Sequence, residues 1–494
     1  MPADSRTATT LPGSSAGWRL EHTYAALPDL FFSAVAPTPV REPRLVIFNR
    51  PLATALGLDP AALDGPDGAA IFAGNALPPG AQPIAQAYAG HQFGHFTALG
   101  DGRAILLGEQ ITPDGARFDL QLKGPGPTPY SRRGDGRAAL GPMLREYIIS
   151  EAMHALGVPT TRSLAVATTG ETVHRETELP GAVLTRIAAS HLRVGTFQWA
   201  AAAGEPAHVR ALVDYTLRRH FPELTGTDQP AQALLDAVIE RQAALIARWM
   251  LIGFIHGVMN TDNMALSGET IDYGPCAFLD TFAPATVFSS IDRHGRYAYG
   301  NQPTIAQWNL TRFAETLLPL LDADENTAIA RATASLQRFP DRFQEHWLAG
   351  MRAKLGLFTA EPDDAALFKS LLEAMHQAKA DYTNTFAAFC DARSPDTALP
   401  LPEEFRQRYA ARLARQPQSP AESLALRRAT NPAIIPRNHL VEAALTAAVR
   451  GDLAPLHRLL DALSRPFDHD HAPAEFREPP SDAHAAHYQT FCGT

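Results

Sequence analysis

Alternating apolar and polar positions predict strands in the first part of the chain. Residues 118–123 read FDLQLK, the two-residue period of a strand with one buried face. A PDG turn at 113–115 and the glycine-containing run 97–110 precede it, which predicts a loop followed by a β-hairpin. Two further runs, 161–170 and 181–188, also favour strands. Together these segments predict a five-stranded sheet carrying one helix.

Apolar residues recur at helical spacing after residue 136. Leu140, Leu144 and Ile148 predict a helix over about 137–156, with Gly157 as its stop. The later pattern predicts helices over about 205–221 and 230–256, after 304, after 364 and from 438 to 463. MALSGETI, residues 264–271, indicates a short hairpin. The chain is therefore predicted to have an α+β fold with a β-rich part ahead of a larger helical part.

These patterns divide the chain into five parts. We expect an N-terminal leader and irregular wrapping segment (1–95), a β-rich lobe (96–190), a helical lobe (191–340), a C-terminal helical extension (341–463) and a tail (464–494). The first part mixes short apolar runs with many Pro and Gly, and the tail is rich in Pro, His and Asp.

Charge and composition exclude several classes of partner. A net charge of −9 argues against a general nucleic-acid or anionic-membrane binder, because both require a basic surface. The longest apolar helix carries Asp236, Glu240, Arg241 and Arg248, which argues against a membrane span. Three scattered cysteines suit a reducing compartment. We expect a cytoplasmic monomer with no nucleic-acid or membrane partner.

The stretch HGVMNTDNM, residues 256–264, matches most of a protein kinase catalytic loop, H-R-D-L-x-x-x-N. His256 takes the His place and Asn263 the Asn place. Val258 occupies the proton-accepting position and cannot accept a proton. Asp262 is the only carboxylate in the stretch. Asp272 lies eight residues after the end of this stretch. In kinases the aspartate of the D-F-G motif likewise follows the catalytic loop.

Other residues occur in the same order as in a kinase. Lys123 ends the alternating strand, and Glu146 lies on the following helix. In kinases a strand lysine and a helix glutamate occur in this order and form the ion pair that positions the nucleotide phosphates. Asn263 and Asp272 offer oxygen ligands for magnesium bound to phosphate. Gly100 and Gly102 allow backbone amides to approach a phosphate, although such a pair also marks an ordinary turn.

Arginines and histidines give a less selective signal. The candidate phosphate clamps are Arg132, Arg133, Arg137, Arg186 and Arg193, and the residues alone do not choose among them. His91 and His95 have a metal-compatible spacing, but Gly94 argues against a helix, so we expect packing near the first strand. We expect the tail pair His469 and His471 to form no specific site.

Several long blocks resemble the selenoprotein O family of kinase-like protein adenylyltransferases. They include AYAGHQFGHFTALGDGRA, LQLKGPGPTPYSRRGDGRA, REYIISEAMHALGVPTTRSLA, SHLRVGTFQ and HGVMNTDNM with IDYGP. The resemblance implies a two-lobed protein kinase-like fold with a small β-rich N-lobe, a helical C-lobe and added terminal segments. It also implies ATP bound end for end, so that AMP passes to Ser, Thr or Tyr hydroxyls of protein substrates.

The resemblance also implies roles for individual residues. Asp262 would accept the proton, while Asn263 and Asp272 would hold Mg²⁺ or Mn²⁺. Glu146 would pair with Lys123, and the lobe-junction residues Arg186 and Arg193 would grip the γ-phosphate. The nucleotide would be held by Gly100, Gly102, Arg103, Lys123, Asp135, Gly136, Arg186, Arg193 and Asp272.

A redox role is implied for two cysteines. Cys492 corresponds to the family's C-terminal redox residue, but the chain ends here in CGT. Cys276, four residues after Asp272, is the candidate partner.

Two other functions compete with AMP transfer. One is a kinase-type phosphotransferase that uses Asp262 as its base, and the other is a catalytically inactive nucleotide-binding scaffold, which Val258 would favour.

Overall fold

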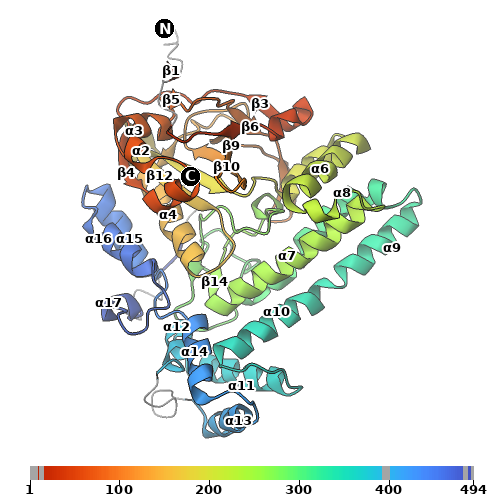
Figure 1. Ribbon diagram of the computed structural model, residues 1–494, viewed down its shortest axis with the longest axis vertical. Coiled ribbons are helices and arrows are strands. Elements are labelled where there is room, and N and C mark those ends of the chain that lie inside the picture. The colour runs from red at the N-terminus through yellow and green to blue at the C-terminus, as the bar shows by residue number, and fades with distance from the viewer. Residues whose placement is uncertain (1–8, 11–15, 392–400, 482–487, 491–494) are drawn as a thin grey trace.

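The computed structural model describes residues 9–10, 16–391, 401–481 and 488–490, and shows a mixed α+β fold. A large sheet with its short covering helices forms one end of the molecule, and the long helices form the other (Figure 1). None of the helices in the described ranges is long and apolar enough to cross a membrane.

The main sheet has nine strands rather than the five predicted. The strand order is β3-β6-β9-β10-β13-β12-β4, while β2 pairs with β9 and β11 with β13, and every pairing is antiparallel. Their bounds are Leu20–Glu21 (β2), Phe32–Ala34 (β3), Arg44–Phe48 (β4), Ile84–Gln86 (β6), Ala104–Ile111 (β9), Arg117–Lys123 (β10), Ala138–Ala139 (β11), Arg162–His174 (β12) and Glu178–Ala188 (β13). The additional strands are two to five residues long, too short to show a period in the sequence.

Strand β10 is buried on both faces, so the prediction of a half-buried strand was wrong. The apolar residues Leu120 and Leu122 pack under the N-terminal segment, and the polar residues Asp119, Gln121 and Lys123 are buried as well. Helices α1 (Arg50–Ala55), α2 (Pro60–Leu63) and α3 (Pro66–Phe72) contribute Leu52, Leu63, Ile71 and Phe72 to that covering layer. The N-terminal segment thus closes the outer face of the sheet and also adds strands to it.

Helix α4, Leu140–Ala155, confirms the helix predicted after the glycine-rich loop. It packs against β12 and β13 on one side and against α15 on another (Figure 1). Leu144 and Ile148 are fully buried, and Glu146 is 2% exposed. The packing therefore brings a carboxylate inside the protein close to the sheet.

The helical part contains the helices predicted at about 205–221, 230–256, after 304 and after 364, and it also contains helices that were not predicted. Its bounds are Val194–Ala202 (α5), Pro206–His220 (α6), Pro230–Ile252 (α7), Gln302–Leu321 (α8), Glu325–Leu336 (α9), Phe339–Lys354 (α10), Asp364–Gln377 (α11), Tyr382–Ala388 (α12), Glu403–Ala414 (α13), Pro420–Thr430 (α14), Asn438–Val449 (α15), Ala454–Leu463 (α16) and Ala474–Arg477 (α17). Helix α5 was not predicted, because it is buried on most sides and shows no polar stripe. The predicted helix 438–463 is two helices, separated at Gly451, whose φ is 92°.

A loop and a short pair of strands follow the long helix α7. Gly253 ends α7 with φ 73°, and β14 (Phe254–Ile255) pairs with β15 (Ala277–Phe278) around the loop between them. The hairpin predicted for 264–271 was wrong, because its two arms bridge to other segments: Ala265 to Arg193 and Thr270 to Thr160. These bridges tie the loop to the sheet end of the molecule.

Candidate functional site

A cavity of about 1600 Å³ lies between the sheet and the helices. The predicted nucleotide, metal and catalytic residues all line it: Gly100, Gly102, Arg103, Lys123, Asp135, Gly136, Glu146, Arg186, Arg193, Asp262, Asn263 and Asp272. Cys276, the described cysteine of the predicted redox pair, is not among the lining residues.

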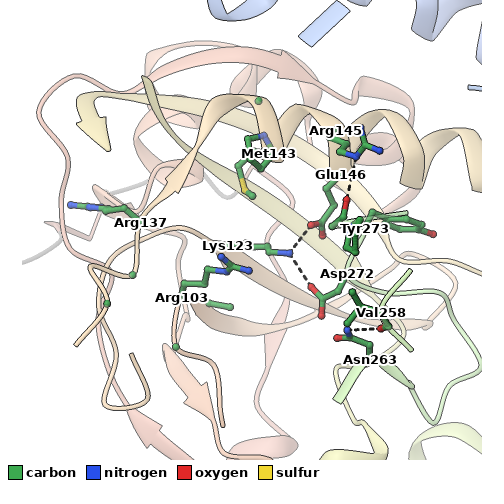
Figure 2. A pocket seen from close by; sticks show the side chains of 18 of the residues that line it. Arg103, Lys123, Arg137, Met143, Arg145, Glu146, Val258, Asn263, Asp272 and Tyr273 are labelled. Carbon is green, nitrogen blue, oxygen red and sulfur yellow. Dashed lines mark hydrogen bonds and ion pairs between the residues drawn. The ribbon is translucent and has the colours of Figure 1, made fainter. Parts of the chain in front are cut away.

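An ion cluster occupies the inner wall of this cavity. The Lys123 Nζ atom donates to Glu146 Oε2 at 2.6 Å and to Asp272 Oδ1 at 2.9 Å (Figure 2). The lysine comes from the end of β10, the glutamate from α4 and the aspartate from the loop after β14. Three distant segments thus meet at one amine.

Two buried arginines complete the cluster. Arg186 on β13 donates from Nε to Glu146 Oε1 at 2.9 Å and from Nη2 to Asp272 Oδ1 at 2.7 Å. Arg193, just before α5, donates from Nη1 to Asp272 Oδ2 at 2.8 Å and to the Asp262 carbonyl at 2.7 Å. Arg186 Nη1 and Arg193 Nε are buried without a hydrogen-bond partner among the described residues. The cluster therefore retains donors that a phosphate oxygen can use.

The cations keep both carboxylates of the cluster ionised. Burial alone would raise the pKa of Asp272, but Arg186, Lys123 and Arg193 hold it well below its ordinary value. Burial acts in the same direction on Glu146, and Arg186 and Lys123 lower its pKa in turn. Two anions thus face three cations, which leaves one net positive charge for an anionic ligand.

Asn263 and Asp272 offer a pair of oxygen donors that fits a small divalent cation. The Asn263 side-chain nitrogen donates to the Val258 carbonyl at 2.9 Å, so its Oδ1 is the atom left for a ligand (Figure 2). In the described part of the chain no group of three His, Cys, Asp or Glu residues could hold a metal. Mg²⁺ commonly binds through one or two carboxylates together with substrate phosphates, and this donor set suits that mode.

Asp262 lies in a tightly packed place at the edge of the cavity. It is 7% exposed, and its Oδ1 atom is buried without a hydrogen-bond partner in the described structure. Burial raises its pKa to about 6. Gly90 lies so close that a Cβ atom there would be 2.3 Å from Oδ1. The carboxylate is therefore fixed, and it can accept a proton at neutral pH.

The glycines of the loop before β9 have a packing reason that the sequence did not reveal. Gly100 has φ 102°, and a Cβ atom on it would lie 2.5 Å from the Tyr130 ring. A Cβ on Gly102 would lie 2.9 Å from the Tyr130 carbonyl. These two glycines allow the glycine-rich loop 124–136 to close over the cavity wall.

The remaining predicted nucleotide residues lie at the outer side of the cavity. Asp135 is exposed and forms a two-bond ion pair with Arg175, whose hydrogen bonds lower the aspartate's pKa. Gly136 has φ 64°, and a Cβ atom on it would lie 2.0 Å from the Gly126 carbonyl oxygen. Arg175 is a cavity residue that the sequence analysis missed, because nothing in its local pattern marks it.

Among the five candidate arginines, the ion cluster contains only Arg186 and Arg193. Arg137 donates to the Thr38 carbonyl at 3.2 Å, away from the cluster. Arg132 and Arg133 line the cavity with φ 49° and 77°. Tyr88, also missed, stacks under Arg193, with the guanidinium carbon 4.7 Å from the ring centroid.

Of the predicted redox pair, Cys492 lies outside the described residues, and its role stays a prediction. Cys276 is fully buried, and burial raises the pKa of its thiol to about 12. Thr490 donates from Oγ1 to the Pro275 carbonyl at 2.7 Å, so the described end of the chain reaches the residue before Cys276.

The histidines do not form a metal site in the described structure. His91 lies on β7 (Ala89–Gln92) and His95 on β8 (His95–Ala98), so they are not helical. His91 packs against Gln198 of α5 and Trp308 of α8 rather than near the first strand. In the tail, His469 Nε2 contacts the Asn431 carbonyl and His471 pairs with Asp468.

The chain is similar to a known protein family and to named bacterial proteins over nearly its whole length. The family described as "Protein adenylyltransferase SelO" matches residues 17–464. A protein of Alkaliphilus metalliredigens, named protein nucleotidyltransferase YdiU, is 61% identical over 482 residues, 97% of this chain and 98% of the relative. Relatives of the same name from Halalkalibacterium halodurans and Geobacillus kaustophilus are each 60% identical and cover 97% of this chain.

The family match spans the cavity and nearly all the elements that line it, and the relatives align over almost their full lengths. The chain therefore belongs to the SelO family of protein adenylyltransferases.

Proposed function

We propose that this enzyme transfers AMP from ATP to Ser, Thr or Tyr hydroxyls of protein substrates, on a two-lobed kinase-like fold. The family and the names of the relatives support nucleotidyl transfer to protein. The observation that carries the proposal is that the ion cluster and the buried carboxylate of Asp262 share one cavity.

ATP binds with its triphosphate along the ion cluster. Lys123, Arg186 and Arg193 supply three cations, against the two carboxylates of Glu146 and Asp272. Positioning and charge neutralisation supply most of the catalysis in phosphoryl and nucleotidyl transfer.

ATP binds in the inverted orientation, with its γ-phosphate innermost. Arg186 is 1% exposed and Arg193 is 3% exposed, and each has a buried nitrogen without a hydrogen-bond partner in the described chain. The terminal phosphate carries the highest negative charge, so it gains most from these two guanidinium groups. The α-phosphate then lies toward Asp262.

Asp262 acts as the base. The substrate hydroxyl oxygen forms a bond to the α-phosphorus, its proton passes to the Asp262 carboxylate, and the bond from the α-phosphorus to the bridging oxygen breaks, releasing pyrophosphate. With its pKa near 6, Asp262 is ionised at neutral pH and can take this proton. The loop that carries Asp262 is oriented by the hydrogen bond from the Arg193 side chain to the Asp262 carbonyl and by the close packing of Gly90.

Asn263 and Asp272 would hold Mg²⁺ or Mn²⁺. When bound, such an ion neutralises charge on the phosphate oxygens. The Asn263 side chain is oriented for this by its hydrogen bond to Val258.

Incubation with ATP labelled at either the α- or the γ-phosphate tests the proposal. We expect label on protein from α-labelled ATP only. Label from γ-labelled ATP only would instead establish the phosphotransferase alternative, and label from neither would establish an inactive nucleotide-binding scaffold.

The variant Asp272→Ala serves as the matched loss-of-function control. It removes the carboxylate that contacts Lys123, Arg186 and Arg193, so the transfer should disappear. Activity that survives this change would contradict the assignment of the cavity.

A further inference from the structure

A surface next to Asp262 carries one exposed and two partly buried aromatic side chains together with a positive charge, and the chemistry above does not use it. The β7–β8 hairpin, the loop 292–297 and helix α8 form it. We call it the hairpin surface and define it by His91, Phe96, Arg296 and Trp308. The His91 ring is 5.4 Å from the rings of both Phe96 and Trp308, so the side chains form one continuous patch.

The hairpin is fixed directly on the loop that carries Asp262. The His91 backbone N–H donates to Thr261 Oγ1 at 2.7 Å, and the Phe93 N–H donates to Asn260 Oδ1 at 3.1 Å. The Tyr297 hydroxyl donates to the same Asn260 oxygen at 2.6 Å, which ties the loop 292–297 to this place. Anything bound to the hairpin surface is therefore held at a fixed position relative to Asp262.

The outer strand of the hairpin has a free edge. In the described structure β8 pairs with β7 alone. Phe96 on this strand is 51% exposed, the second highest exposure among the large apolar side chains that the structure describes. An unpaired strand edge with an exposed apolar side chain can bind an extended peptide through its backbone groups.

Arg296 gives this surface its charge. Its guanidinium carbon lies 4.7 Å from the centre of the Trp308 ring, and it forms no ion pair with any described residue. Asp292, the acidic residue of the same loop, accepts from the backbone N–H groups of Arg296 and Tyr297 at 2.9 and 2.7 Å. Arg312, the other cation over Trp308, is paired with Glu315. Among the four residues that define the hairpin surface, Arg296 is the cation, and no carboxylate in the described part of the chain forms an ion pair with it.

We propose that the hairpin surface is the docking site for protein substrates and selects an acidic side chain close to the acceptor hydroxyl. An extended substrate segment pairs with the edge of β8, its carboxylate binds Arg296, and its hydroxyl reaches Asp262. This inference rests on the proposed function. Charge complementarity supports it, since a guanidinium stacked on an aromatic ring and left without an anion favours a carboxylate ligand. Aromatic and arginine side chains are also typical anchors of protein interfaces.

Synthetic peptides test the selection directly. Ser-, Thr- and Tyr-centred peptides are prepared with either Glu or Lys at the flanking positions, and AMP transfer is followed with α-labelled ATP. For the wild-type enzyme at low ionic strength we expect kcat/KM to favour the Glu-flanked peptides by about tenfold. The preference should fall as salt is added, because the contact is at the surface.

Variants of the hairpin surface separate charge from apolar contact. Arg296→Glu should reverse the preference toward Lys-flanked peptides, while Arg296→Lys should keep the original preference. Phe96→Ser should raise KM for both peptide sets with kcat unchanged. Arg408→Glu on α13 makes the same charge change at an exposed position elsewhere and should alter neither value. All variants should bind ATP with wild-type affinity, which also reports correct folding.

The outcomes distinguish this inference from the proposed function. Equal transfer to both peptide sets by the wild type, or an unchanged preference in Arg296→Glu, overturns the docking site and leaves AMP transfer standing. Absence of α-label on any peptide or protein overturns both. A change in oligomeric state in Phe96→Ser, measured by sedimentation, would assign the surface to a second copy of this chain and overturn substrate docking.

Discussion

The carboxylates of Glu146 and Asp272 owe their ionised state to the neighbouring cations Lys123 and Arg186. Each carboxylate is surrounded by at least two cations, and burial alone would drive it toward the neutral form. Removing one member of such a cluster leaves an uncompensated charge in the interior, at a cost of about 3–5 kcal/mol. The cluster is therefore a unit, and a single substitution within it tests both stability and nucleotide binding.

Asp262 stands outside this cluster and can be tested separately. Asp262→Asn keeps the side-chain volume but removes the proton acceptor, so AMP transfer should fall about 10²–10⁴-fold. ATP affinity, measured by equilibrium binding, should stay unchanged because the cluster is intact. Transfer within tenfold of the wild type would show that Asp262 is not the base.

At the scale of elements, several residues of the site lie at or beyond the ends of secondary-structure elements, while Glu146 lies within α4 and Arg186 within β13. Lys123 is the last residue of β10, Arg193 immediately precedes α5, and Asp272 lies between β14 and β15. Element ends can present a side chain or backbone group without disturbing the pairing along the element. The bridges Arg193 to Ala265 and Thr160 to Thr270 hold these ends together.

Helix α10 contains a buried lysine, Lys354. Its side chain lies over the Phe386 ring at 3.9 Å, and burial lowers its pKa to about 7. The unfolded chain binds a proton at this lysine up to a pH near 10.4. Burial of the charged lysine therefore lowers the free energy of unfolding. This loss is fully present below about pH 7 and disappears as pH rises toward the pKa of the lysine in the unfolded chain.

Lys354→Met should raise the free energy of unfolding by about 2 kcal/mol near pH 7, because it removes a buried charge that has no anionic partner among the described residues. The gain should shrink as pH rises to about 10, and denaturant unfolding at several pH values measures it. A gain independent of pH would contradict the titration of Lys354.

At the scale of the whole molecule, the N-terminal segment completes the protein by covering the sheet. The cluster of Leu52, Leu63, Phe72, Leu120 and Leu122 joins that segment to the strands that carry the site. Because both faces of the sheet are covered, Lys123 can be buried and still reach the cavity. The covering layer thus supports the site without contributing side chains to it.

Phe72→Ala tests this support. Phe72 is 1% exposed and its ring stacks on Phe48, so the change should lower the free energy of unfolding by about 3–5 kcal/mol. ATP affinity of the folded fraction should be unchanged at a temperature well below the transition. Thermal unfolding monitored with and without ATP measures both effects, and a loss of affinity in the folded protein would show that the layer acts directly on the site.

The sequence predicted many elements and most of the site because each of those features depends on the residues of one continuous segment. The hairpin before Lys123, the helix carrying Glu146 and the loop HGVMNTDNM each follow from spacing within one segment. Helix α5 and the short strands could not be predicted, since a helix buried on most sides has no polar stripe and strands of two to five residues are too short to show a period. The hairpin at 264–271 failed because its arms pair with distant residues rather than with each other.

By itself, then, the sequence determined the order of the elements and the chemical types that line the cavity, because periodicity and residue identity are local properties. Only the tertiary structure decided that Arg186 and Arg193 form ion pairs with Asp272, and that both faces of β10 are buried. The same holds for the position of Arg296 beside the loop of Asp262. Each of these depends on packing between segments far apart in the chain, and no spacing within one segment encodes which other segment will cover it.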